Sequence, residues 1–178
     1  PQAEKSDDRQ TIIDKINAAG GCAVLAHPAW SLNSIDDAKA LSGITATEIY
    51  NAVSEAGESL RPYSDHFVDM CAVNGMYFGI FAVDDAHYYG GIDDRRGWVM
   101  VKADELTDEA IVNAIKNRNF FASQGPMLSV TREGDKVIIE TSPCDTVAVL
   151  SDFAWLPNRI KRGDGITRHE YTFRNDEK

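Results

Sequence analysis

The sequence is poor in the residues that cross-link a chain or anchor it in a membrane. Its three cysteines, Cys22, Cys71 and Cys144, are far apart and form no C-x-x-C pair. This argues against a disulfide framework and indicates buried or inert thiols. No apolar run approaches the roughly 20 residues of a membrane-spanning helix, and no secretory signal is visible. We therefore expect no membrane partner and favour a cytoplasmic location. An amino-terminal leader is not visible in the sequence.

Positive charge is also scarce. Lys and Arg together number 18 against 28 Asp and Glu, which gives a formal net charge of −10. Nucleic acids and anionic membranes are bound by clustered cations, so we expect neither as a partner. A small phosphorylated substrate stays possible, because bound metal ions reverse the local sign of a site.

The first 83 residues alternate between helical and strand patterns. Recurrent apolar positions and capping residues predict helices over about 8–19, 34–43 and 58–74. Short apolar runs predict strands at 22–26, 45–50 and 76–83. Buried strands that alternate with helices are typical of a parallel sheet with right-handed crossovers. The sequence therefore predicts an α/β fold.

The pattern changes after residue 91. A strand is predicted at 97–103 and a helix after Thr107, and alternating strands follow from about residue 126, with a hairpin turn at 133–135. We divide the chain into an α/β segment, residues 1–125, and a small antiparallel β-rich subdomain, residues 126–178, which is incomplete at its end.

Polar side chains follow each predicted parallel strand, where ligands bind in such sheets. His27, Asn51, and Asp85 with His87 stand at these three strand ends. Zinc, manganese and iron favour imidazole and carboxylate ligands, and residues i and i+2 of an extended chain point to the same side. This pattern favours a metal site. The alternatives are a structural histidine before Pro28, and turn or helix-cap chemistry for the aspartates.

Three motifs, in this order, resemble the second half of a PHP-domain protein (the polymerase and histidinol phosphatase superfamily): "GGCAVLAHPAW", "TEIYN" and "AVDDAH". The segment "RGWVMVKADELTDEAIVNAIKNRNFFASQGP" is similar to the one that follows the final motif in one branch of predicted PHP metal-dependent phosphoesterases. The resemblance covers about residues 10–150. It implies part of a distorted β/α barrel, usually of seven strands, with up to three divalent metal ions at the carboxyl ends of the strands.

The resemblance also implies roles for single residues. His27 stands at the third family motif and Asp85 and His87 at the fourth, so these three are implied as ligands of Zn, Mn or Fe. Glu48 and Asn51 lie on the "E-x-Y-N" strand that recurs in this branch, and we take them as pocket-lining candidates.

Four further residues are weaker candidates. Asp84 precedes the fourth motif and is expected to orient the His87 ring or the nearby loop. Trp30 lines the pocket or, alternatively, packs in the core. Arg95 and Arg96 either contact a substrate phosphate or belong to a solvated loop.

The opening half of the family barrel has no counterpart here. The sequence contains four histidines, at 27, 66, 87 and 169, and none forms the His-x-His pair that opens the family. We expect His66, on a helix, and His169, on a late strand, at the surface. We also expect the missing half of the barrel as a partner, on the same or another polypeptide, and little activity from this chain alone.

The resemblance thus implies a metal-dependent phosphoesterase that hydrolyses a small phosphate ester through metal-activated water. One alternative is an amidohydrolase-type metal hydrolase, although those enzymes usually present a single late aspartate without an Asp-x-His pair. The other is a degenerate barrel that acts as a non-catalytic scaffold or regulatory module. The sequence does not predict the substrate, the identity of the metal or the oligomeric state.

Overall fold

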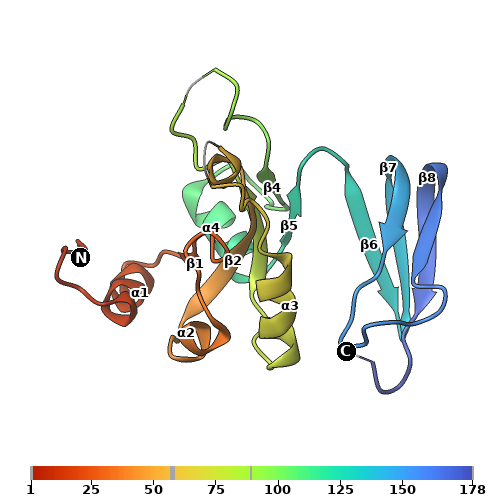
Figure 1. Cartoon of the computed structure of the whole chain (residues 1–178), viewed down its shortest axis with the longest axis horizontal. Helices are drawn as coiled ribbons and strands as arrows, with labels where there is room; N and C mark the ends of the chain where they lie inside the picture. Colours follow the sequence, from red (N-terminus) through yellow and green to blue (C-terminus); the bar gives the residue numbers. More distant parts are fainter. Residues whose placement is uncertain (1, 57–58, 89, 178) are drawn as a thin grey trace. The chain divides into compact units, whose positions relative to one another are not determined.

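The computed structural model describes residues 2–56, 59–88 and 90–177 and divides into two compact units (Figure 1). Unit 1 is Pro1–Gln124 and unit 2 is Gly125–Lys178. Among the described residues, no helix has both the length and the apolar character needed to cross a bilayer.

Unit 1 is built on a parallel sheet. Its strands, in the spatial order β1-β2-β3, are β1 (Ala23–Leu25), β2 (Ile44–Asn51) and β3 (Gly79–Val83). The helical segments of this part are α1 (Arg9–Ala18), α2 (Ile35–Lys39), a 3-10 turn η1 (Val53–Glu55) and α3 (Asp65–Val73). The predicted α/β fold with parallel strands is therefore confirmed.

Local sequence explains where α2 lies. Ser34 and Asp37 form a reciprocal capping box that starts α2, because each side chain accepts the backbone N–H of the other. Ala38 of α2 then packs in one buried cluster with Phe67 and Cys71 of α3. The shared cluster holds both crossover helices together, and their strands present their carboxyl ends at one edge of the sheet.

A second, antiparallel sheet lies beside β3. It consists of β4 (Trp98–Val101) and β5 (Phe120–Ser123), joined through α4 (Asp108–Lys116). Phe120 packs edge-on against Phe81 of β3, with ring centroids 4.9 Å apart. Strand β5 was not predicted, because its "FFAS" run is short and directly precedes a Gly-Pro turn.

The strands of unit 1 form open sheets. Closing a barrel requires a hydrogen-bonded neighbour on every strand, yet β1 is an edge of the three-stranded sheet, and no strand in the described part of the chain pairs with its other side. The predicted barrel is thus not confirmed, and the part of the fold that is present is a three-stranded parallel sheet.

The predicted helix 58–74 is wrong in its first part, since α3 begins only at Asp65. Residue 58 lies outside the described residues. The backbone before α3 pairs with β2 instead: the N–H of Asn51 donates to the carbonyl of Pro62, and the N–H of Ser64 donates to the carbonyl of Ile49. A proline at 62 also disfavours helix at the residue before it.

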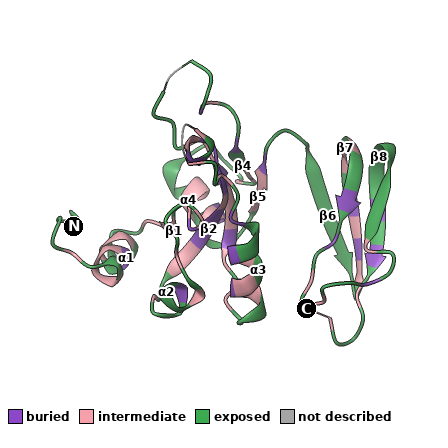
Figure 2. Cartoon of the chain, in the orientation of Figure 1, coloured by how far each residue is buried: buried purple, intermediate pink, exposed green. Residues whose placement is uncertain are grey.

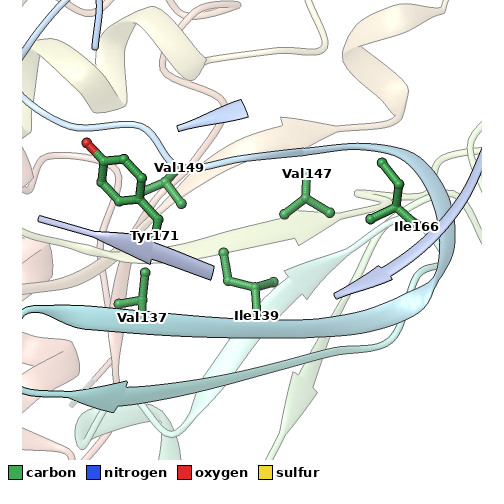
Figure 3. Packing of buried hydrophobic residues seen from close by; sticks show 6 residues of the cluster. All are labelled: Val137, Ile139, Val147, Val149, Ile166 and Tyr171. Atoms are coloured by element: carbon green, nitrogen blue, oxygen red, sulfur yellow. The ribbon is translucent and has the colours of Figure 1, made fainter. Parts of the chain in front are cut away.

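Unit 2 is an antiparallel sheet in the order β6-β7-β8, with β6 (Leu128–Glu133), β7 (Lys136–Ala148) and β8 (Ile160–Thr172). The predicted hairpin is confirmed: Gly134, at φ +64°, lies in the turn between β6 and β7. One face of the sheet carries the core of the unit (Figure 3), formed by Val137, Ile139, Val147, Val149, Ile166 and Tyr171. Strand β6, in contrast, is exposed along its length (Figure 2).

His169 is buried, so its predicted surface position is wrong. Its neighbours Arg168 and Glu170 point outward, and a residue between two outward-facing positions of a strand points inward. His169 pairs with buried Ile139 of β7. Its Nε2 is buried without a hydrogen-bond partner among the described residues. His66 is exposed on α3 as expected.

Candidate active site

Three strand ends of unit 1 meet at one cavity. His27 follows β1, Asn51 ends β2, and Asp85 follows β3. The cavity measures about 550 Å³, and His27, Asp85 and His87 all line it. The three residues with predicted metal-ligand roles therefore face the same space.

His27 and Asp85 lie close enough to act together. His27 Nε2 is 3.9 Å from Asp85 Oδ2. The other ring nitrogen, Nδ1, is 2.8 Å from Ser31 Oγ. A partner at Nδ1 fixes the orientation of an imidazole and leaves Nε2 for a ligand, as is common for metal-bound histidines.

A buried hydrogen-bond network links these two residues through β2. The Nδ2 of Asn51 donates to Glu48 Oε2 over 2.9 Å and to Asp85 Oδ2 over 3.1 Å. Glu48 Oε2 also accepts the backbone N–H of His27 over 2.7 Å. The Asn51 Oδ1 accepts the backbone N–H and the hydroxyl of Ser54, which sets the orientation of the amide. Glu48 and Asn51 thus hold the strand ends together.

The backbone at two of the three candidate ligands is unusual. The φ angle is +28° at His27 and +49° at Asp85. Positive φ costs energy for residues other than glycine and recurs at functional sites, where the surroundings enforce it. In this structure the buried Glu48 carboxylate, which binds the His27 N–H, is part of those surroundings.

His87 lines the cavity without completing a ligand group. Its Nδ1 lies 2.6 Å from the backbone carbonyl oxygen of Asp85, so the ring is folded back on its own loop. Within residues 2–56, 59–88 and 90–177, no three His, Cys, Asp or Glu side chains gather closely enough to hold a metal ion.

Asp84 organises the loop between β3 and β4, which runs from residue 84 to residue 97 (Figure 1). Its carboxylate accepts the backbone N–H groups of Arg95, Arg96 and Gly97 at 2.6, 2.8 and 3.0 Å. Partial burial by itself raises the pKa of Asp84, but these three hydrogen bonds outweigh it, and its pKa lies below the ordinary value. Of its two expected roles, the hydrogen bonds correspond to holding the loop.

Asp93 is a site residue that the sequence did not single out. It is fully buried, and it accepts the backbone N–H of His87 over 2.6 Å and that of Tyr88 over 3.0 Å. Asp84 therefore ties the start of the loop to its end, and Asp93 ties the segment at His87 to the later part of the loop. The available signal was an aspartate in a glycine-rich loop, a residue type that often caps backbone N–H groups in turns.

The two arginines lie away from the cavity lining. Arg95 is exposed, with its Nε 3.9 Å from Asp94 Oδ2. Arg96 Nη1 is 3.8 Å from Glu55 Oε2. Both pairs are surface contacts, which contribute little to stability. Trp30, in contrast, lines the cavity and packs edge-on against the His27 ring, with ring centroids 4.9 Å apart.

The donor set suits one divalent ion. An imidazole nitrogen and a carboxylate oxygen are ordinary ligands for zinc, and two such ligands on one tetrahedral ion lie roughly 3.3 Å apart. The observed 3.9 Å between His27 Nε2 and Asp85 Oδ2 is slightly longer. Both residues line the cavity that His87 also lines.

No protein-family model matches the sequence, and no curated protein matches it significantly. Among solved structures, the chain is similar to that of a two-domain protein containing a predicted PHP-like metal-dependent phosphoesterase from Bacteroides vulgatus ATCC 8482, with a TM-score of 0.53 and 15% sequence identity. The similarity covers 93% of this chain and 57% of that one, so this chain spans little more than half of that protein's length. At this level of identity the similarity concerns the fold alone and says nothing of the chemistry.

Proposed function

We propose that unit 1 carries part of the active site of a metal-dependent phosphoesterase. The observation that carries this proposal is the approach of His27 Nε2 to Asp85 Oδ2, from two different strand ends, in a cavity that His87 also lines. The PHP-like fold of the solved structure supports it, because that protein is described as containing a predicted metal-dependent phosphoesterase.

In this proposal the side chains of unit 1 bind and position. His27, Asp85 and His87 hold a divalent ion, Zn, Mn or Fe, which when bound supplies positive charge for the phosphate oxygens and acidifies water. Glu48 and Asn51 keep the two strand ends at a fixed spacing. Asp84 and Asp93 hold the loop that carries His87 against the cavity.

The proposed site needs further ligands. Phosphoester hydrolysis by two or three ions requires more donors than one His-Asp pair and a third residue. We propose that these come from further strands that extend the sheet on the free edge of β1, as a partial barrel of the PHP type implies. On this basis the chain by itself binds at most one ion loosely and hydrolyses phosphate esters poorly.

Metal binding tests the proposal directly. Isothermal titration of the full chain with Zn²⁺ or Mn²⁺ should give one weak site. Its affinity for the ion should fall at least tenfold in His27→Ala or Asp85→Asn. His66→Ala and Asp94→Asn are matched controls, because His66 is an exposed histidine on α3 and Asp94 lies in the same loop outside the cavity lining. Equal affinity in all four variants would refute the proposed site.

The scaffold alternative is favoured by one observation, the lack of a three-residue ligand group in the described part of the chain. The two functions differ in a measurable way. A phosphoesterase gains activity on an aryl phosphate when metal and the segment that completes the site are supplied, and loses it again with Asp85→Asn. A scaffold shows neither metal binding nor activity under the same conditions.

A further inference from the structure

The cavity beside His27 and Asp85 has walls that are unusually aromatic for an exposed surface. Trp30 is 48% exposed and Tyr88 is 59% exposed, yet both line this one cavity. Ile92, 55% exposed, lies on the same lining. Single exposed apolar residues are common on proteins, but several gathered around one concave site are typical of ligand recognition.

Trp30 is held in place by two contacts. Its indole Nε1–H donates to Ser59 Oγ over 3.0 Å, so the polar edge of the ring is satisfied. Its ring meets the His27 ring at an interplanar angle of 78° and a centroid distance of 4.9 Å. A ring that is fixed before a ligand arrives loses little entropy on binding, and nearly half of its surface remains open for contact.

Tyr88 is anchored through its backbone. Its N–H donates to both carboxylate oxygens of the fully buried Asp93, at 3.2 and 3.0 Å. The anchor fixes the residue at the cavity while its side chain stays exposed. The metal-ligand candidates His27 and Asp85 line the same cavity.

The lining also limits the charge of a ligand. Among the described residues that line this cavity, none is Lys or Arg. A ligand with several phosphates needs such cations along its length, whereas a single phosphate is neutralised by one bound ion. The residues that line the cavity therefore suit a ligand with one anionic group and one flat apolar group.

We propose that this cavity binds a phosphate monoester whose alcohol part is a flat aromatic ring, and that Trp30 and Tyr88 select it by stacking. The phosphate end rests on the proposed phosphoesterase function. The ring end rests on the two aromatic side chains alone. Trp30 and Tyr88 are thus specificity-determining residues, with the ring kept next to the ester bond that is to be cleaved.

The test compares two esters that differ only in the ring. Binding of phenyl phosphate and cyclohexyl phosphate to the full chain, with Zn²⁺ present, is measured by ligand-observed NMR. Stacking should make the phenyl ester bind about fivefold more tightly. Trp30→Leu and Tyr88→Leu, which keep an apolar side chain, should each reduce this preference to less than twofold. Trp155→Leu is the control, because Trp155 is an exposed tryptophan of unit 2 that does not line the cavity.

A second pair of ligands separates the two ideas. Phenol and cyclohexanol carry the same rings and the same oxygen without phosphate. If phenol is preferred over cyclohexanol in a manner that depends on Trp30 or Tyr88 while neither phosphate ester binds better than its alcohol, the ring site stands and the phosphoesterase proposal fails. If the aromatic and saturated rings bind equally in both pairs, or if the preference survives both leucine variants, the ring site is overturned.

Discussion

The side-chain amide of Asn51 donates to Glu48 over 2.9 Å, at the same carboxylate oxygen that accepts the backbone N–H of His27. Because Asn51 also donates to Asp85, a single buried amide connects the ends of three parallel strands. The position of the candidate ligands is therefore set by β2, a strand that supplies none of them.

Replacing the side-chain amide of Asn51 should destabilise the edge of the sheet at which the three strands end. Asn51 is 1% exposed, and Asn51→Leu leaves the buried Glu48 carboxylate without one of its donors. We expect a loss of about 3 kcal/mol in the free energy of unfolding, measured by urea denaturation. Asn113→Leu, at an exposed position of α4, is the control and should change stability by no more than about 0.5 kcal/mol. A similar small effect of Asn51→Leu would mean that the network does not stabilise the fold.

Asp84 should control the mobility of the loop that carries His87. In Asp84→Asn, a neutral amide replaces a carboxylate that accepts three backbone N–H groups. Hydrogen bonds to charged groups contribute about 2 kcal/mol each, so the amides of Arg95, Arg96 and Gly97 should exchange with solvent at least tenfold faster. Hydrogen exchange followed by NMR measures this. Asp94→Asn should leave the three rates unchanged, and equal rates in both variants would contradict the role given to Asp84.

His169 is a place where a buried polar atom weakens unit 2. Its Nε2 has no partner among the described residues. Since an apolar side chain of similar size removes the cost of an unsatisfied polar group, His169→Leu should keep or raise stability by up to about 1 kcal/mol. Thermal unfolding measures the change. Ile139→Ala, at the paired position on β7, should instead cost about 3 kcal/mol, and a comparable loss for His169→Leu would show that the imidazole is satisfied.

Glu170 should contribute to the acid stability of unit 2. Its carboxylate lies 2.6 Å from Lys136 Nζ and 2.6 Å from Arg168 Nη2. The hydrogen bonds from Lys136 and then Arg168 lower the pKa of Glu170 from 4.5 to about 2. A depressed folded-state pKa gives stability that is complete above the ordinary value and is lost as the pH falls toward about 2.

NMR titration of the Glu170 carboxyl group measures this shift. Glu170→Gln should flatten the decline of stability between pH 4.5 and about 2. Because both ion pairs of Glu170 are exposed, added salt should raise the pKa of Glu170 back toward its ordinary value. An ordinary pKa at low salt would show that the ion pairs do not form in solution.

The sequence predicted the parallel α/β core because its signals are local. The apolar run that ends at Val83 and the Ser34 cap each act within a few residues, and the structure has both where the pattern put them. The start of α3 and the strand β5 were missed, since their backbones pair with segments that are distant in sequence.

In the candidate site, too, local patterns were predicted and contacts between distant segments were missed. The positions of His27 and Asp85 at strand ends follow from the strand pattern. The roles of Glu48 and Asp93 do not, because a buried carboxylate is recognised only by the backbone N–H groups that fold onto it. His169 was missed for a different reason: its charged neighbours were taken as a sign of exposure, whereas strand alternation places it inside.

The φ angles of His27 and Asp85 are +28° and +49°. At both positions a side chain that could bind a ligand therefore stands on a strained backbone. Glycine adopts such angles without a steric penalty, so Asp85→Gly relieves backbone strain of order 1 kcal/mol while it deletes the carboxylate. Backbone strain and a candidate ligand are then linked at Asp85, because the residue that relieves the strain removes the carboxylate. A natural chain that keeps histidine and aspartate there retains a local strain that selection for folding alone would remove.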